Sequence, residues 1–544
     1  ATFNGPDATS PAAPMVCWVN NGRTRPGSNG ALDQDLPLPA NDAGDANCAQ
    51  GQITCPRDLE NFFRLWIRGV PQLPSTQGYT VTLSMSAVSG APAINLYLSS
   101  DPQGGTGYLT DTNAAAEQAR TEMSPNPEFG LALATVNAQQ SYTLPPDFFD
   151  YHYPYYSRFL FEGAGIGEGQ LTLTIAQNGN PLAQTSVYLD IHDIKDLYEQ
   201  AHITGVPTNY PAMVQETNAT TFVSDHELPS SLTESNQLVV FVHGWRMGFW
   251  DYQSFSDTMF KRLYWSGYQG RFAALRWPTL SKDDYWVLSD LQSYTTYNRS
   301  EYIAHRWAAG EPADFHCPKA GLPDYSVNVA AHSMGNIVMM ETLKTQLAEG
   351  HQSIDNYVMM QAAVPAQCYD TSLPDYSLFT SAENATSTSH TPDVYRGFPG
   401  NIATAVNGQI VNFYNANDFA LATGTIGIPP LTANVSWEGN QLSYKPDGFW
   451  GYHSDGTNCF QDTLGTRTLT DPREKMAFVA RPRSKAVGAL AGVGGQVSGG
   501  QFDLNANFSF DRKAAEHSAE FNWPIQRMNG TNGFYRVLLQ KLFP

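Results

Sequence analysis

A serine at position 333 lies in a pattern that could perform nucleophilic chemistry. A short apolar run ends at Ala331, residues 331–335 read Ala-His-Ser-Met-Gly, and a helical pattern begins at once. A sharp turn from strand to helix needs small residues two positions before and after its centre, and Ala331 and Gly335 are small. Such a turn exposes the serine hydroxyl and directs the next backbone N–H, that of Met334, towards a developing oxyanion. The pattern predicts that Ser333 is a nucleophile.

A His-Gly-Trp sequence upstream of the serine could complete an oxyanion site. Gly244 would let the backbone approach a substrate closely. The N–H of Trp245 is the expected second donor, with that of Arg246 as the alternative. The aromatic side chains of Trp245, Phe249 and Trp250 could line an apolar acyl pocket or belong to the core under the next helix. We therefore treat these three residues as candidate substrate contacts.

A serine nucleophile needs a histidine base and an acid that orients it. Asp418 follows an apolar run, and a carboxylate at the end of a strand could reach over the sheet edge. Asp370 is the alternative acid, and Asp418 could instead cap the turn that follows it. His517 precedes the last amphipathic pattern and is the expected base, while His453 lies in a turn-rich segment and is the alternative. The predicted triad is Ser333, Asp418 and His517.

The segments around these residues are predicted to form a parallel sheet covered by helices. Continuous apolar runs are typical of strands that are buried on both faces. They occur at residues 237–242, 272–277, 326–331, 354–360 and 410–414. Helical patterns such as 336–348 lie between them, and 534–542 is an amphipathic pattern at the end of the chain. This alternation predicts an α/β fold with a doubly wound sheet.

The N-terminal part of the chain has a different pattern. Alternating apolar and polar residues, typical of antiparallel strands, occur at 79–85, 93–98, 158–161 and 171–175. We predict a segment rich in Pro, Gly and Asn at 1–60, an all-β, sandwich-like domain at 61–190 and a linker at 191–235. The catalytic α/β domain is then 236–544, with a lid insertion at 425–465.

With these elements assigned, residues 237–420 resemble a bacterial group of α/β-hydrolase-fold proteins that are similar in pattern to lipases and esterases. The matching features are the strand before His243-Gly244-Trp245, the later Arg276-Trp277-Pro278, the AHSMGN turn at 331–336 and Asn-Ala-Asn-Asp at 415–418. The resemblance implies the α/β-hydrolase doubly wound sheet and a Ser-His-Asp triad. It leads us to expect hydrolysis of carboxylic esters, whether small molecule, lipid or polymer, through an acyl-enzyme.

The net charge and the distribution of apolar residues argue against nucleic acid as a partner and against a transmembrane segment. A formal net charge of −20 gives nucleic-acid binding little electrostatic support. No run of 18 apolar residues that could span a bilayer occurs, so we expect no transmembrane segment. The acidic stretch at 33–47 matches no EF-hand spacing, and we expect neither a metal nor a cofactor.

The six cysteines form no Cys-x-x-Cys metal pattern. Read as up to three disulfide bonds, they indicate an oxidising compartment, whereas six buried thiols would indicate the cytosol. The sequence begins at Ala1, which fits a mature form after removal of a signal peptide. We expect a secreted, periplasmic or cell-surface protein.

Two other functions are compatible with the same residues. An acyltransferase could use the same triad with an acceptor other than water. A non-catalytic surface binding protein could use the β domain for binding and keep the hydrolase unit as scaffold. In the enzyme hypothesis, the accessory β domain is a candidate for contact with the substrate.

Overall fold

A computed structural model gives the arrangement of the chain. The structure describes residues 8–20, 56–67, 75–118 (with gaps), 133–145, 158–203, 220–224, 235–277 (with gaps), 325–373 (with gaps), 400–421 (with a gap), 434–445 (with a gap), 486–508, 517–522 and 533–544.

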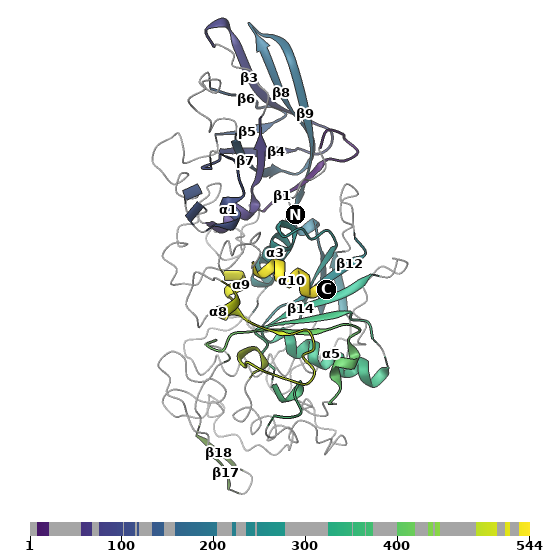
Figure 1. The fold of residues 1–544 in the computed structure, drawn as a ribbon. Coiled ribbons are helices and arrows are strands. Elements are labelled where there is room, and N and C mark those ends of the chain that lie inside the picture. The colour runs from purple at the N-terminus through teal and green to yellow at the C-terminus, as the bar shows by residue number, and fades with distance from the viewer. Residues whose placement is uncertain are drawn as a thin grey trace.

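A largely parallel sheet of eight strands forms the centre of the C-terminal part (Figure 1). Its order is β11-β10-β13-β12-β14-β15-β16-β19, and every adjacent pair is parallel except β10 with β11. The strands are β10 (Glu199–Ile203), β11 (Thr220–Ser224), β12 (Gln237–Val242), β13 (Arg271–Arg276), β14 (Ser326–His332), β15 (Asn356–Met360), β16 (Ile410–Tyr414) and β19 (Gln501–Asp503). The chain therefore contains an α/β sheet, as its apolar runs predict.

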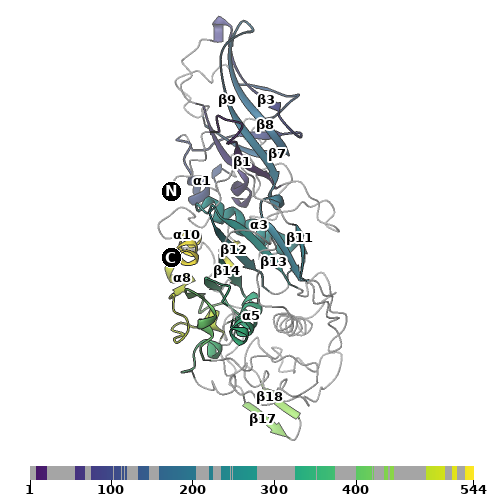
Figure 2. The same ribbon diagram turned by 90° about the vertical axis from the view of Figure 1, so that its right-hand side faces the viewer.

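Helices cover both faces of this sheet. In β12, Val239 and Phe241 share a core with α3 (Phe249–Trp265) and α10 (Phe534–Leu542). The alternate residues of β12, such as Val240, share a separate core with α5 (Gly335–Glu349). Successive side chains of a strand point to opposite faces, so a strand between two helical layers must be apolar throughout. Figure 2 shows α3 and α5 on opposite sides of the strands.

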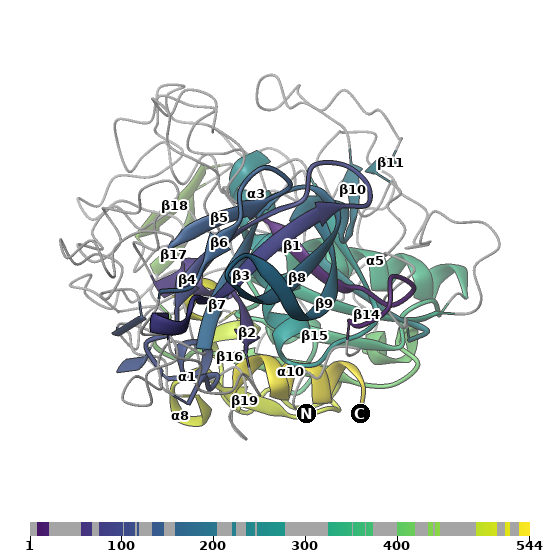
Figure 3. The ribbon, with the colours of Figure 1, turned by 90° about the horizontal axis from the view of Figure 1, so that it is seen from above.

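Two smaller sheets form the N-terminal unit, which lies beyond α3 at one end of the molecule (Figures 1 and 2). Seen from that end, their strands lie in front of the large sheet (Figure 3). Their orders are β1-β9-β8-β3-β6 and β2-β7-β4-β5, and all neighbours are antiparallel except β1 with β9. The strands are β1 (Met15–Val19), β2 (Phe63–Trp66), β3 (Tyr79–Ala87), β4 (Ala93–Leu98), β5 (Ala134–Asn137), β6 (Tyr142–Thr143), β7 (Arg158–Gly165), β8 (Gly167–Gln177) and β9 (Asn180–Asp193). Residues from both sheets share one core, as in a sandwich.

Short elements complete the described chain. They are the 3-10 helices η1 (Pro56–Asn61), η2 (Ser75–Gln77), η5 (Ile194–Asp196), η6 (Ala366–Cys368), η7 (Ile402–Ala405) and η8 (Val487–Ala489), and the helices α1 (Gly107–Thr110), α8 (Leu504–Asn507) and α9 (Ala519–Asn522). A two-stranded hairpin, β17 (Asn434–Glu438) with β18 (Gln441–Lys445), lies within the segment predicted as a lid.

The core of the N-terminal unit continues into the core under α3. The ring of Trp18 on β1 lies 5.0 Å from that of Tyr264 on α3, and the ring of Phe63 on β2 lies 5.3 Å from that of Trp265. The same cluster of buried residues includes Phe241 in the centre of the large sheet. One continuous apolar core therefore extends from the N-terminal unit into the unit that contains the large sheet.

The segment 191–235, predicted as a linker, contains two strands of the large sheet, β10 and β11. Its apolar pattern is weak because β10 carries buried polar groups. Glu199 on this strand is buried against Arg271 of β13, with 2.9 Å between Oε1 and Nη1. A buried charge needs such a partner, and a strand stabilised in this way is not recognised from apolar residues alone.

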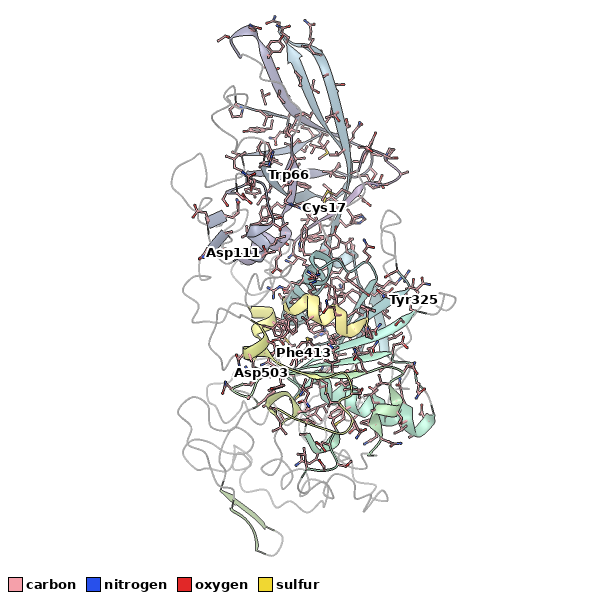
Figure 4. The ribbon with its side chains drawn as sticks, in the orientation of Figure 1. Cys17, Trp66, Asp111, Tyr325, Phe413 and Asp503 are labelled. Carbon is pink, nitrogen blue, oxygen red and sulfur yellow. The ribbon has the colours of Figure 1, made fainter. Side chains whose placement is uncertain are left out.

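Two of the six cysteines are buried free thiols. They are Cys17 on β1 and Cys368 in η6, and Figure 4 labels Cys17 within the N-terminal unit. The prediction of up to three disulfide bonds is therefore wrong for these two residues, and the other four cysteines lie outside the described residues. Burial raises the pKa of both thiols, which keeps them protonated. The export of the chain stays a prediction.

The described residues also bear on whether the chain has a transmembrane segment or a metal site. None of the helices there is long and apolar enough to cross a membrane. The same residues contain no cluster of three or more His, Cys, Asp or Glu side chains that could hold a metal ion. The acidic stretch at 33–47 lies outside them.

Candidate active site

The sharp turn predicted at Ser333 is present between β14, which ends at His332, and α5, which begins at Gly335. The backbone φ of Ser333 is 52°, in the left-handed region that a residue with a side chain seldom adopts. The Ser333 N–H donates to the carbonyl of Met360 at 2.9 Å, and its carbonyl accepts from the N–H of Ala363 at 3.0 Å. The end of β15 therefore fixes the strained residue in place.

The two glycines of the predicted site lie where a larger residue would collide. A Cβ at Gly335 would lie 2.5 Å from the carbonyl oxygens of both Val242 and His243. A Cβ at Gly244 would lie 2.9 Å from the Cβ of Ser333. The turn after β12 and the turn after β14 are therefore in direct contact, as a shared oxyanion site requires.

The structure brings Ser333, His517 and Asp418 together in one hydrogen-bonded chain. His517 Nε2 lies 2.7 Å from Ser333 Oγ, and His517 Nδ1 lies 2.6 Å from Asp418 Oδ2. Since a carboxylate only accepts, Nδ1 carries the proton and Nε2 is free to accept the serine proton. Asp418 is fully buried, whereas the His517 side chain is 16% exposed. The His517 side chain can therefore contact a ligand while Asp418 is shielded from water.

Asp418 makes the contacts that both of the roles considered from the sequence would require. Its Oδ1 accepts from the N–H of Leu421 at 3.2 Å and so caps the following turn. Its Oδ2 accepts from His517 and also from Gln361 Nε2, at 2.6 Å each. The carboxylate is thus held at both oxygens, which fixes the orientation of the imidazole.

The alternative acid, Asp370, has other partners. It accepts from Ser372 Oγ at 2.6 Å and from the N–H of Gly494 at 2.7 Å. Burial alone would raise the pKa of Asp370, but the hydrogen bonds from Ser372 and Gly494 lower it below its ordinary value. Asp370 therefore stays ionised and anchors two loops. The alternative base, His453, lies outside the described residues.

His332, the residue before Ser333, contacts the predicted base. Its Nε2 lies 3.0 Å from the backbone carbonyl of His517. A carbonyl only accepts, so Nε2 carries the proton. Burial, and secondly the nearby His517, lower the pKa of His332 to about 3. His332 is therefore a neutral donor that positions the backbone of His517.

His243 fixes the turn that leads to the predicted oxyanion donor. The N–H of Trp277 donates to His243 Nε2 at 3.2 Å, so the proton of the ring is on Nδ1 and donates to the carbonyl of Gly244 at 2.8 Å. The side-chain rings of His243 and Trp277 stack with their centroids 5.4 Å apart. His243 thus holds the backbone immediately before residue 245.

The remaining predicted site residues are placed only in part. Met334, fully buried, follows the serine and is the N-cap residue of α5, so its N–H lies where helix N–H groups lack partners within the helix. Phe249 and Trp250 are the first residues of α3, but their side chains lie outside the described residues, as does all of Trp245. The acyl pocket and the second oxyanion donor stay predictions.

Asn336 and Gln361 support the site without having been singled out from the sequence. Asn336 Nδ2 donates to the carbonyls of Ala331 and Ser333, at 2.9 Å each, and Asn336 Oδ1 accepts from the Tyr357 hydroxyl at 2.7 Å. Gln361 has a φ of 43° and follows the last residue of β15 directly. A polar residue at the carboxyl end of a buried strand is the signal that could have identified it.

Comparisons with known proteins give little further information. No protein family and no curated protein matches the chain. A solved structure of a hyperthermophilic esterase from the archaeon Pyrobaculum calidifontis is 20% identical over 29% of this chain and 45% of its own, with a TM-score of 0.16. A monoclinic form of an esterase from the same organism is 14% identical over 33% and 58%, also with a TM-score of 0.16. The chain thus spans about half the length of these structures, and likeness at this score does not identify an activity.

Proposed function

We propose that the chain is a serine hydrolase of the α/β-hydrolase type that cleaves carboxylic esters. The observation that carries the proposal is the unbroken chain of hydrogen bonds from Ser333 through His517 to Asp418. These residues occur in the order Ser, Asp, His along the sequence, at a turn between a strand and a helix, as in that fold. Further support comes from the strained φ of Ser333 and from the close approach of Gly244.

In the proposed mechanism, His517 Nε2 removes the proton of Ser333 as Oγ attacks the ester carbonyl carbon. The carbonyl π electrons move onto oxygen, and the N–H groups of Met334 and Trp245 are the proposed donors to that oxyanion. When the tetrahedral intermediate collapses, His517 gives its proton to the departing alcohol and the acyl group stays on Oγ. Water, deprotonated by the same imidazole, then attacks the acyl-enzyme. When this second intermediate collapses, the Ser333 Oγ–acyl bond breaks, His517 returns its proton to Oγ, and the acid is released.

Asp418 has a defined task in this cycle. During each attack, His517 becomes an imidazolium, and the buried carboxylate 2.6 Å from Nδ1 stabilises that charge. The second donor to the same oxygen, Gln361, prevents the carboxylate from turning away. The group that orients the base is therefore itself oriented before the substrate binds.

The proposal is tested with a fluorophosphonate probe and with p-nitrophenyl esters of several chain lengths. We expect the probe to modify Ser333, identified by mass spectrometry of the labelled peptide, and Ser333→Ala to abolish both labelling and turnover. Ser372→Ala, which removes a hydroxyl bonded to Asp370, is the matched control and should keep the activity. A folded protein that is not labelled at Ser333 would contradict the proposal. Acyl transfer to an added alcohol in excess of hydrolysis would reassign the enzyme as a transferase.

A further inference from the structure

A buried ion pair joins the N-terminal unit to the helix that covers the large sheet. Glu60, at the end of η1, places Oε1 2.9 Å from Nε of Arg262 on α3, and both side chains are fully buried. The indole N–H of Trp265, also on α3, donates to the backbone carbonyl of Glu60 at 2.9 Å. Glu60 of η1 therefore binds α3 through both its side chain and its backbone.

Arg262 also reaches the segment that carries the proposed base. Its Nη1 donates to the backbone carbonyl of Glu520 at 2.5 Å, and the Tyr535 hydroxyl donates to the same carbonyl at 2.9 Å. Glu520 belongs to the short helix α9, which begins at Ala519, two residues after His517. The main chain just after the histidine is thus held by a side chain of α3 and by one of α10.

The charge on Arg262 makes this arrangement depend on Glu60. Desolvation by burial acts to lower the pKa of Arg262, but the Glu60 carboxylate and the Tyr535 hydroxyl raise it, and the result lies above the ordinary value. A buried guanidinium is tolerated only beside a compensating charge, and here the N-terminal unit supplies it. The planar group then presents further N–H donors in a fixed direction, towards α9.

Movement of α9 would disturb the site at two points. Phe521 on this helix packs against His332, with ring centroids 5.3 Å apart, and against Phe255 of α3 at 4.7 Å. Glu520 places a carboxylate oxygen 3.5 Å from His332 Nε2, the atom that also meets the His517 carbonyl. Thus α9 supports His517 directly along the chain and indirectly through His332.

We propose that the N-terminal β unit positions His517, and that the Glu60–Arg262 pair transmits this effect by fixing the main chain of α9. Glu60 and Arg262 are positioning residues, and neither is proposed to touch the substrate. The catalytic consequence rests on the proposed ester hydrolysis, whereas the physical link between Glu60 and α9 does not. Because a misplacement of about 1 Å can cost on the order of 100-fold in rate, loosening this link should lower kcat more than it raises KM.

The test is Arg262→Lys, chosen to keep the buried positive charge beside Glu60. The lysine side chain is shorter and ends in an ammonium rather than a planar guanidinium. It therefore cannot donate to the Glu60 carboxylate and to the Glu520 carbonyl at the same time. The matched control is Trp265→Phe, which removes the bond from α3 to the Glu60 backbone and leaves the ion pair intact. Both variants loosen the same contact between η1 and α3, but only the first removes a bond to α9.

Three readouts are required, namely ester kinetics with labelling, amide hydrogen exchange and proton NMR, and the last two need no substrate. For Arg262→Lys we expect kcat with a p-nitrophenyl ester to fall about 10-fold or more, KM to change less than about 2-fold, and labelling of Ser333 to slow in parallel. We also expect amide hydrogen exchange at residues 518–522 to accelerate relative to both wild type and Trp265→Phe. Proton NMR should show weakening of the downfield signal from the His517–Asp418 hydrogen bond.

The outcomes separate this proposal from the proposed function. If wild type is inactive and unlabelled but exchange at 518–522 accelerates in Arg262→Lys, the ester hydrolase is wrong and the link stands. If Arg262→Lys and Trp265→Phe behave alike in kcat, exchange and the NMR signal, the link is overturned and the ion pair only holds the two units together. If Arg262→Lys does not fold, Glu60→Gln, which keeps the arginine and weakens its anchor, is measured in the same way.

Discussion

The two carboxylate oxygens of Asp418 have different partners, so one substitution can separate them. In Asp418→Asn, the amide oxygen can still accept from Leu421, and the stability of the turn should be retained. The amide nitrogen would then face His517 Nδ1 and Gln361 Nε2. The imidazole would adopt the tautomer that cannot accept the serine proton, and the Gln361 amide would turn over to offer its oxygen in place of Nε2. We expect kcat to fall by roughly 10⁴-fold with little change in melting temperature, as for other triads in which geometry is kept and the tautomer is lost. Equal losses of activity and stability would contradict this separation of roles.

His332 should make the fold sensitive to acid. Its pKa is lowered from the ordinary 6.5 to about 3, chiefly by burial. Between these two values the unfolded chain binds a proton that the folded chain does not, so the free energy of unfolding falls as the pH falls. The limiting slope for one such group is about 1.4 kcal/mol per pH unit. The loss should begin as the pH drops below 6.5 and end near pH 3.

The measurement is the midpoint of urea unfolding at pH values that span this window. His332→Gln keeps an N–H that can donate to the carbonyl of His517 but has no group that titrates there. We expect the midpoint of this variant to decline less steeply with acidification than that of wild type. Parallel pH curves for the two proteins would show that His332 is not the sensor.

At the scale of elements, the start of α5 is pressed against the end of β12. A Cβ at Gly335 would lie 2.5 Å from two backbone carbonyl oxygens, which cannot move without moving β12. Gly335→Ala should therefore displace Ser333 from His517 and reduce kcat by about 100-fold or more, in addition to lowering the melting temperature. The kinetics of ester hydrolysis and a thermal melt measure the two effects.

The opposite end of the same helix supplies the control. Gly350 has a φ of 74° and no atom within 4 Å of an added Cβ. Gly350→Ala should cost only backbone strain, about 1 kcal/mol, and leave kcat unchanged. A loss of kcat as large as that of Gly335→Ala would mean that general softening of α5, and not contact at its start, controls the rate.

The apolar strands and the turn at Ser333 could be predicted because they follow local rules. A strand between two helical layers has an apolar residue at every position, and β12 shows this from Leu238 to Val242. β10 could not be predicted because its buried Glu199 is compensated by Arg271, a partner 72 positions away. The same applies to Arg262, since nothing local to it indicates Glu60.

Position along the chain favours Asp418 and His517 as partners of Ser333, and the structure adds the contacts that hold them. A late histidine and an acid after a buried strand are features of chain order, which a sequence displays. Gln361, which contacts Asp418, and His332, which contacts His517, act through geometry that arises only when three strands lie side by side. The assignment of catalytic roles to these contacts stays a proposal until Ser333 is tested.

At the scale of the whole molecule, the two units should unfold together. The core of the N-terminal sheets continues through Trp18 and Tyr264 to Phe241, and the Glu60–Arg262 pair crosses the same boundary. If one unit unfolded alone, the other would expose apolar surface to water, and Glu60 or Arg262 would lose its charged partner. We expect one calorimetric transition, and two resolved transitions would contradict a shared core.

The pairing of β1 with β9 has a consequence for how the protein is made. Met15 pairs with Leu189, and Trp18 packs against Tyr264, so β1 is synthesised long before the residues with which it pairs and packs. At synthesis rates of about 5–20 residues per second, this delay is roughly 10 to 35 seconds for β9 alone. During that interval β1 has no partner strand, and nascent or interrupted chains would present its unpaired edges to one another. Expression yield should therefore depend on translation speed and on chaperones that shield β-strand edges.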